Sequence, residues 1–77
     1  MKIYKLTQTE NSGYDTYDSI IVCSEDEEEA KKICPNGDNK FDTGAWASKE
    51  ENVQVEYLGE AEEYLEKGII LASFNAG

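Results

Sequence analysis

Apolar and polar residues follow strand-like patterns in four segments of the chain. Val53, Val55 and Tyr57 alternate with polar residues, which is the two-residue period of a strand with one buried face. The run IILASF at residues 69–74 is continuously apolar and predicts a well-covered final strand. The other two predicted strands are residues 2–9 (KIYKLTQT) and 17–23 (YDSIIVC), which are rich in β-branched and aromatic residues.

Two segments carry helix signals. Ser24 belongs to the residue types that cap helix N-termini, and Glu27 three positions later completes a capping box. We expect this helix to stop before Pro35, because a proline disfavours helical geometry in the preceding residue. A second, short helix is predicted in the acidic segment 60–67, with Gly68 as its C-terminal stop.

Together these elements predict one small α+β domain over residues 1–77. Turn-forming residues at 11–13 separate the first two strands, which are therefore expected to form a hairpin. The order is strand, strand, helix, strand, short helix, strand, and we expect a single-layer sheet of about four strands covered by one main helix. Residues 35–52 form the longest irregular segment, a kind of loop that is often functional.

The charge balance narrows the classes of partner. The chain has 77 residues, with 17 acidic and 7 basic side chains and a net charge of -10. This charge repels nucleic-acid phosphates and anionic membranes, so we expect neither nucleic acid nor membrane as a partner. Basic protein surfaces, cations or another partner that tolerates the negative field, such as a small polar ligand, remain open. No apolar run is long enough to span a membrane and the N-terminus has no signal-peptide core, which predicts a cytoplasmic protein.

Residue types that metal, redox and common catalytic sites need are missing or badly spaced. There is no histidine, and Cys23 and Cys34 form no CxxC pair, so we expect two ordinary thiols, no disulfide and no zinc site. Residues 36–42 offer oxygen ligands but fail the EF-hand spacing. Without histidine, the Ser-His-Asp and Cys-His arrangements are excluded. The sequence therefore predicts a protein that is not an enzyme and has no catalytic residue, metal or cofactor.

The stretch GYDTYDS, residues 13–19, is the main candidate site. In a binding site, Tyr14 and Tyr17 would stack on a planar ligand or partner side chain, while Asp15 and Asp18 accept hydrogen bonds from it. In the structural alternative, Tyr17 packs in the core and the aspartates bond the local backbone, as is common in turns. The sequence leaves both interpretations open.

Trp46 and the C-terminal tail could complete this site. Trp46 lies in the long loop, although a single tryptophan in a small domain is more often a core anchor. In the tail SFNAG, two polar residues follow a buried strand with no evident structural need. The predicted ligand- or partner-binding residues are therefore Tyr14, Asp15, Tyr17, Asp18, Trp46, Ser73 and Asn75.

Two interpretations also apply to the acidic run at residues 25–29. It could imitate the phosphates of a DNA backbone and occupy a basic groove of another protein, or it could be the solvated N-terminus of the predicted helix. The second interpretation is preferred unless the acidic residues of segment 60–66 lie on the same face of the molecule.

The chain also resembles a known family. GYDTYDSIIVCSEDEEEAKKI, a loop tryptophan, VQVEYLGEA and KGIILASFNAG are together similar to a family of small acidic proteins encoded in phages, prophages and some bacterial genomes. The resemblance covers nearly the whole chain, and it implies a source more than a mechanism because the family has no established activity. The matching positions are Tyr14, Asp15, Tyr17, Asp18, Trp46, Ser73, Phe74, Asn75 and Gly77.

A phage-type protein without catalytic groups is expected to be an accessory factor that acts by binding in the host cytoplasm. In the leading form it inhibits a host protein, such as a defence protein, through an acidic and aromatic surface. In the alternative it forms a homo-oligomer that sequesters a signalling nucleotide, whose phosphates need a positive pocket. The lysines that could supply one are Lys2, Lys5, Lys40 and Lys49. A bacterial binding module is the third form.

Overall fold

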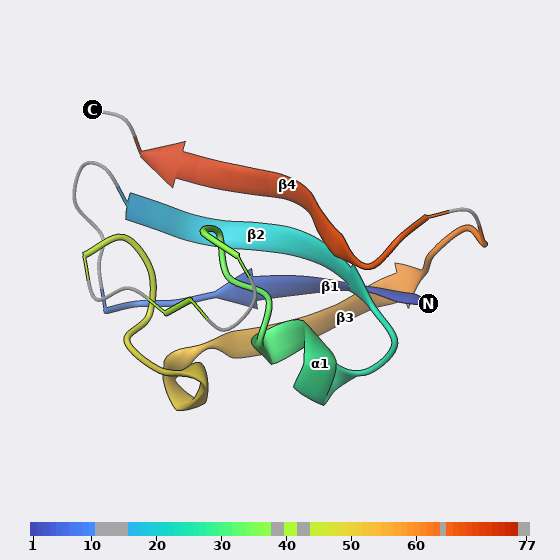
Figure 1. The fold of residues 1–77 in the computed structure, drawn as a ribbon, viewed down its shortest axis with the longest axis horizontal. Helices are drawn as coiled ribbons and strands as arrows, with labels where there is room; N and C mark the ends of the chain where they lie inside the picture. The colour runs from blue at the N-terminus through green and yellow to red at the C-terminus, as the bar shows by residue number, and fades with distance from the viewer. Residues whose placement is uncertain (11–15, 38–39, 42–43, 64, 76–77) are drawn as a thin grey trace.

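Four strands and one short α-helix make up the computed structural model, which describes residues 1–10, 16–37, 40–41, 44–63 and 65–75, the last four by their backbone alone. The elements are β1 (Lys2–Thr7), β2 (Thr16–Ser24), α1 (Glu27–Lys31), the 3-10 helix η1 (Glu50–Asn52), β3 (Gln54–Glu60) and β4 (Gly68–Asn75) (Figure 1). The four predicted strands and the main helix are thereby confirmed. Because α1 has only five residues, the protein is α+β or mostly β.

The sheet is antiparallel, with the strand order β3-β1-β2-β4. The predicted hairpin forms between β1 and β2, in a register that runs from Lys2 opposite Ser24 to Thr7 opposite Ser19. β3 pairs with the other side of β1, and β4 pairs with the other side of β2. The first hairpin is therefore the centre of the sheet, and the two later strands are its edges.

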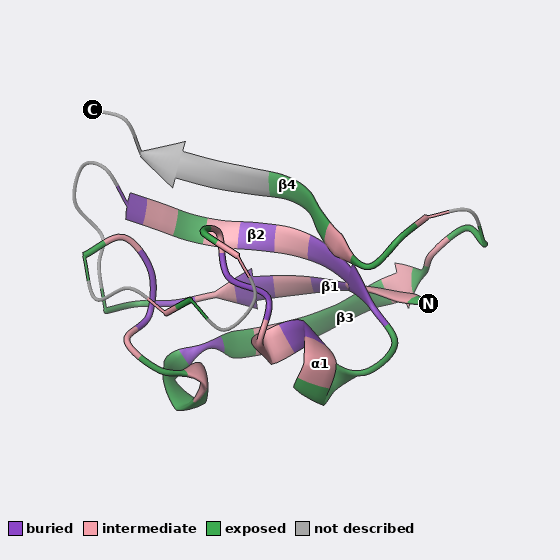
Figure 2. Ribbon diagram, in the orientation of Figure 1, coloured by how far each residue is buried: buried purple, intermediate pink, exposed green. Residues whose placement is uncertain are grey.

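The hydrophobic core lies against the central hairpin. Tyr4 opposite Val22 and Leu6 opposite Ile20 are buried together, because every second residue of a strand points to the same face. α1 packs against β1, β2 and β3, and Figure 1 shows α1 over β3 and the loop that follows it crossing β1 to reach β2. The covering segments contribute Ala30, Ile33, Cys34, Trp46 and Ala47 to the core, which is purple in Figure 2.

α1 begins later than the sequence predicts. Ser24 is the last residue of β2, where it pairs with Lys2 and is fully buried. The N-cap is Asp26, whose side chain accepts a hydrogen bond from the Glu29 N–H at 2.8 Å. The predicted capping box at Ser24 is wrong, because pairing with β1 holds this residue in the strand and the next suitable residue type caps the helix.

The second predicted helix is also wrong. β3 extends to Glu60, and the described residues of 61–67 contain a turn in which the Leu65 N–H donates to the Glu62 C=O. Backbone pairing overrides the helical pattern, since the Ala61 N–H donates to the Met1 C=O at 2.9 Å. Gly68 begins β4 instead of stopping a helix, with a φ of 146° that favours glycine.

β4 is an edge strand, in contrast to the well-covered strand that its apolar run predicts. Ile69, Ile70 and Leu71 are 41%, 47% and 64% exposed. A continuous apolar run is typical of a strand buried on both faces. The strand order instead places β4 outside β2, along the margin of the sheet that lies away from α1 in Figure 1.

The two cysteines match the prediction of ordinary thiols. Cys23 in β2 and Cys34 after α1 are both buried, and neither is part of a disulfide. Cys34 belongs to the core beneath the covering loop, and the Cys23 Sγ lies 3.6 Å from the Met1 Sδ. Both residues therefore fill apolar space, which is common for a cysteine outside a disulfide.

Candidate binding surfaces

The described part of GYDTYDS lies beside the C-terminal tail. The pairs across β2 and β4 are Thr16 with Asn75, Tyr17 with Phe74 and Ser19 with Ser73. The Tyr17 N–H also donates to the Ala45 C=O at 2.8 Å, which joins this strand end to the loop that carries Trp46. The backbones of three segments that were predicted to form one site therefore meet at one end of the sheet.

Where they are described, the side chains at this end mainly support the fold. Tyr17 is half-buried and packs against the core, and the buried Gln8 donates from Nε2 to the Tyr17 C=O at 2.8 Å. Asp18 is exposed. Tyr14 and Asp15 lie outside the described residues, so their role in binding stays a prediction.

Trp46 is the largest fully buried side chain of the core. The core-anchor interpretation is confirmed for this residue, and no part of its ring is exposed for contact with a partner. Trp46 follows Ala45 in the chain, and the Ala45 C=O accepts a hydrogen bond from the Tyr17 N–H near the start of β2. Trp46 is thus a support of this end of the sheet.

The connection between β3 and β4 approaches the start of α1. Lys67 Nζ lies 2.9 Å from the Glu29 Oε2. Lys67 and Glu29 also line, together with Glu25 and Asp26, an open hollow of about 330 Å³. Two segments that are more than 30 residues apart in the chain are therefore neighbours in the fold.

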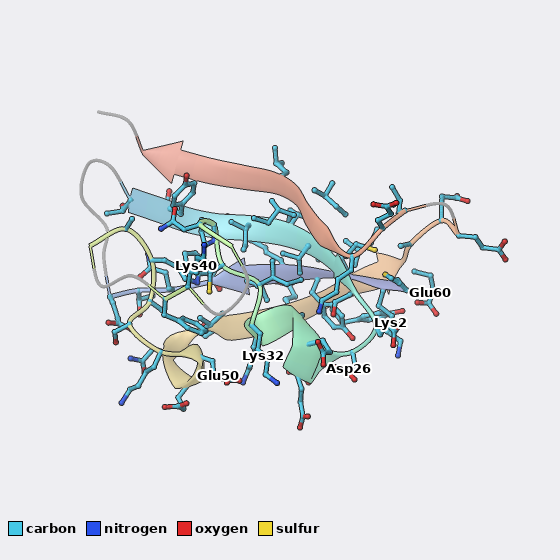
Figure 3. The ribbon with its side chains drawn as sticks, in the orientation of Figure 1. Lys2, Asp26, Lys32, Lys40, Glu50 and Glu60 are labelled. Carbon is cyan, nitrogen blue, oxygen red and sulfur yellow. The ribbon has the colours of Figure 1, made fainter. Side chains whose placement is uncertain are left out.

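Acidic residues of both segments gather at this end. Glu25 and Glu60, with Met1 and Lys2, line a second open hollow of about 290 Å³. In Figure 3, Asp26, Lys2 and Glu60 follow one another along the same part of the surface. We call this region the acidic end, and its acidic residues are those of the run 25–29 together with Glu60.

The acidic end keeps a negative potential despite its lysines. The Lys67 and Glu29 side chains are 38% and 45% exposed, and pairs of this kind contribute only about 0–1 kcal/mol because water screens them. Apart from Glu29, which is half-buried, its acidic residues are exposed. Clustered charge of one sign attracts partners of the opposite sign.

Glu10 joins the end of β1 to the loop before β3. Its Oε2 accepts hydrogen bonds from the Ser48 N–H at 3.0 Å, the Ser48 Oγ at 3.2 Å and the Asn52 Nδ2 at 2.8 Å. The Ser48 N–H, followed by the Asn52 amide, stabilises the carboxylate and lowers the pKa of Glu10 below its ordinary value. Glu10 and Asn52 also line an open polar hollow of about 370 Å³. Sequence analysis missed Glu10, because its partners are 38 and 42 residues away and leave no local pattern.

Tyr57 on β3 forms an aromatic pair with Tyr4 on β1. The ring centroids are 5.8 Å apart and the planes cross at 62°, an edge-to-face arrangement. Desolvation, followed by the negative charge of Glu60, raises the pKa of Tyr57 above its ordinary value. Although its side chain is 55% exposed, Tyr57 is therefore attached to the core through Tyr4.

In the described part of the chain, no group of three or more metal-ligating side chains is placed to hold an ion. No helix within those same residues has the length and apolar content to cross a bilayer. No protein-family model matches the chain, and no match was found among curated proteins or solved structures. Function is therefore inferred from the surfaces of this chain.

Proposed function

We propose that this protein is a non-enzymatic binding protein whose acidic end docks on a basic surface of another protein. The supporting observation is that acidic residues from two separate parts of the chain, the run 25–29 and Glu60 at the end of β3, share one end of the molecule (Figure 3). A capped helix N-terminus accounts for the acids of the run 25–29 but not for Glu60. The gathering of both parts favours attraction of a basic partner.

The negative charge of this surface suits a partner protein with a cluster of lysine and arginine side chains, for example in a groove that binds nucleic acid. Carboxylates of the acidic end would take the place of phosphates in such a groove, and association would be fast and sensitive to salt. The resemblance to phage- and prophage-encoded acidic proteins supports a host protein, such as a defence protein, as the partner. Binding there would inhibit the partner by occupying its groove.

Sequestration of a nucleotide has less support from the geometry. Lys2 lies at the acidic end and Lys40 lies over another part of the sheet in Figure 3. Lys5 is opposite Glu56 in the pairing of β1 with β3. Phosphates need several positive or N–H groups at one place, and these lysines do not supply a shared cradle.

Capture experiments with charge-matched variants test the proposed function. The acidic-end variant carries Glu25→Gln, Glu28→Gln and Glu60→Gln, and the control carries Glu50→Gln, Glu51→Gln and Glu56→Gln. Both lose the same charge, so only the position of the lost charge differs. Tagged wild type and variants are mixed with bacterial lysate, and each captured protein is identified and then purified for affinity measurement.

We expect wild type and the control to bind the same basic protein, and binding to weaken as salt rises. The acidic-end variant should bind it at least about tenfold more weakly, a loss of about 1.4 kcal/mol. A Tyr14→Ala, Asp15→Ala variant, tested in parallel, separates the acidic end from the GYDTYDS stretch. Equal affinity of the acidic-end variant and the control would overturn the proposal.

A further inference from the structure

β4 presents an uncharged strand at the edge of the sheet, with Ile69, Ile70 and Leu71 exposed. Its sequence, GIILASFN, contains no charged residue and no proline. Ile70 and Leu71 are 47% and 64% exposed, although the neighbouring strand β2 buries Ile20 and Val22. In the described part of the chain, no strand follows β4 in the sheet, so one side of its backbone faces outward.

Edge strands usually carry features that prevent pairing with other chains, such as charges, prolines or bulges. The opposite edge, β3, carries Glu56 and Glu60 and has a register shift where it faces Ile3 and Tyr4. The pairing of β4 with β2 has one register shift between Ile69 and Leu71 and another where Ser73 and Phe74 face Ser19 and Tyr17. Between these shifts, Leu71 to Ser73 pair with β2 residue by residue, and this central part of β4 is an edge without charge, proline or bulge.

We infer that β4 pairs in antiparallel orientation with β4 of a second copy of this chain. The two four-stranded sheets then continue as one sheet, with the order β3-β1-β2-β4-β4-β2-β1-β3 across the two copies. A two-fold contact of this kind places the same residues on both sides, so apolar β4 side chains meet apolar β4 side chains. This inference does not depend on the proposed function of the acidic end.

Charge favours a second copy in antiparallel orientation. A basic peptide would find no carboxylate along Gly68–Asn75, whereas an uncharged strand is a suitable partner for itself. The acidic end adjoins the Gly68 end of β4, through Lys67 and Glu29. β4 has eight residues, and a strand of that length spans about 26 Å. Antiparallel pairing therefore separates the Gly68 ends of the two copies by about three Debye lengths at physiological salt, so that their negative charges are screened from each other. Parallel pairing would bring the two acidic ends together.

Assembly should stop at two copies, because the contact uses the exposed β4 edge of each copy. Continued growth would need the β3 edge, where Glu56 and Glu60 oppose pairing. A single strand pair is smaller than the interface of about 800 Å² per partner that is typical of stable complexes, so we expect a dissociation constant in the micromolar range. The dimer would carry two acidic ends that point in opposite directions.

Sedimentation equilibrium of the full chain, from low micromolar to near-millimolar concentration, tests this inference. The test variant is Leu71→Lys on β4, and the matched control is Leu58→Lys on β3, where Leu58 is 48% exposed. Both variants make the same chemical change at an exposed edge leucine. Wild type and Leu58→Lys should pass from monomer to dimer, and Leu71→Lys should raise the dissociation constant by at least about tenfold.

Circular dichroism establishes that each variant is folded, and hydrogen exchange gives a measurement on the wild type that needs no substitution. Backbone amides of β4 should become more protected as concentration rises, while those of β3 should not change. A wild type that stays monomeric across the range, growth beyond the dimer, or equal weakening by the two substitutions would each overturn the inference.

Discussion

The two edge strands of the sheet differ in how their sequence relates to their burial. β3 alternates polar and apolar residues and carries Glu56 and Glu60, yet Val55 packs against the core and Tyr57 pairs with Tyr4. β4 is apolar throughout its first half, and Leu71 is 64% exposed. Among the residues whose side chains the structure describes, the more polar edge therefore has the firmer contacts with the core.

This difference comes from the position of the covering elements. α1 packs on β1, β2 and β3, and η1 leads directly into β3 through the buried Val53. Glu10 adds hydrogen bonds to Ser48 and Asn52 on the same side. β4 is joined to β2 by backbone pairing at the opposite margin. Hydrophobicity makes a strand suitable for burial, but the arrangement of the other elements decides whether it is covered.

The largest expected effect comes from the core beneath the covering loop. Trp46→Ala should lower the free energy of unfolding by about 3–5 kcal/mol, because a large buried ring leaves a cavity. Leu71→Ala should change it by less than about 0.5 kcal/mol at concentrations where the chain is monomeric, since the side chain is mostly exposed. Urea denaturation followed by circular dichroism measures both. Similar losses for the two variants would contradict the difference between core and edge.

Tyr57→Ala tests how firmly β3 is attached. We expect a decrease in melting temperature of about 5 °C, because the substitution removes the edge-to-face contact with Tyr4. Leu71→Ala on β4 is the control, since Leu71 is also more than half exposed. Thermal denaturation of dilute samples measures the melting temperature of both variants. An equal decrease would show that the exposed fraction of the side chain alone predicts the loss of stability.

Asp26→Ala weakens the helix that covers the β3 side. The variant loses the bond from the Glu29 N–H to the cap, and we expect a cost of about 1 kcal/mol. Asp26→Asn is the control, because asparagine also caps helix N-termini. Hydrogen exchange should show that β3 amides lose more protection than β4 amides. Equal loss along both edges would mean that α1 supports the whole sheet uniformly.

The smallest effect is a pH dependence on the β3 side. The folded-state pKa of Glu10 is lowered, so its carboxylate stabilises the fold above the ordinary glutamate pKa of about 4.3, and this contribution is lost as pH falls through the lower folded value. Because Glu10 is exposed, we expect a small change. Urea midpoints between neutral and acidic pH should fall more steeply for wild type than for Glu10→Gln. Glu63→Gln, in the exposed turn before β4, should follow wild type.

Much of the fold could be predicted from local sequence. The segments 2–9, 17–23 and 69–74 each contain most of an observed strand, and the turn residues between the first two correctly predict their hairpin. Alternation at 53–57 identifies β3, and Pro35 follows the end of α1 within a few residues. These features depend on interactions between near neighbours, which leave a periodic pattern in the chain.

The candidate surfaces were less accessible to sequence analysis. The sequence pattern placed Tyr17 and the tail in one candidate site, and the backbones of Tyr17 and Phe74 do pair across β2 and β4, while binding at this site stays a prediction. It gave no sign that Glu10 bonds Ser48 and Asn52, or that the hydrogen bond from Ala61 to Met1 would replace a helix. Such contacts join residues far apart in the chain, and no local period records them.

For this protein, the residue pattern was sufficient to place four strands, one helix and two thiols outside any disulfide, because each reflects a preference that acts over a few residues. The strand order was a matter of long-range pairing, in which the central hairpin takes β3 on one side and β4 on the other. That order left Ile70 and Leu71 exposed, and the contacts of Ala61 and Lys67 brought Glu60 and the acidic run 25–29 to one end. A strand's apolar content does not specify its neighbours, so its exposure depends on the complete fold.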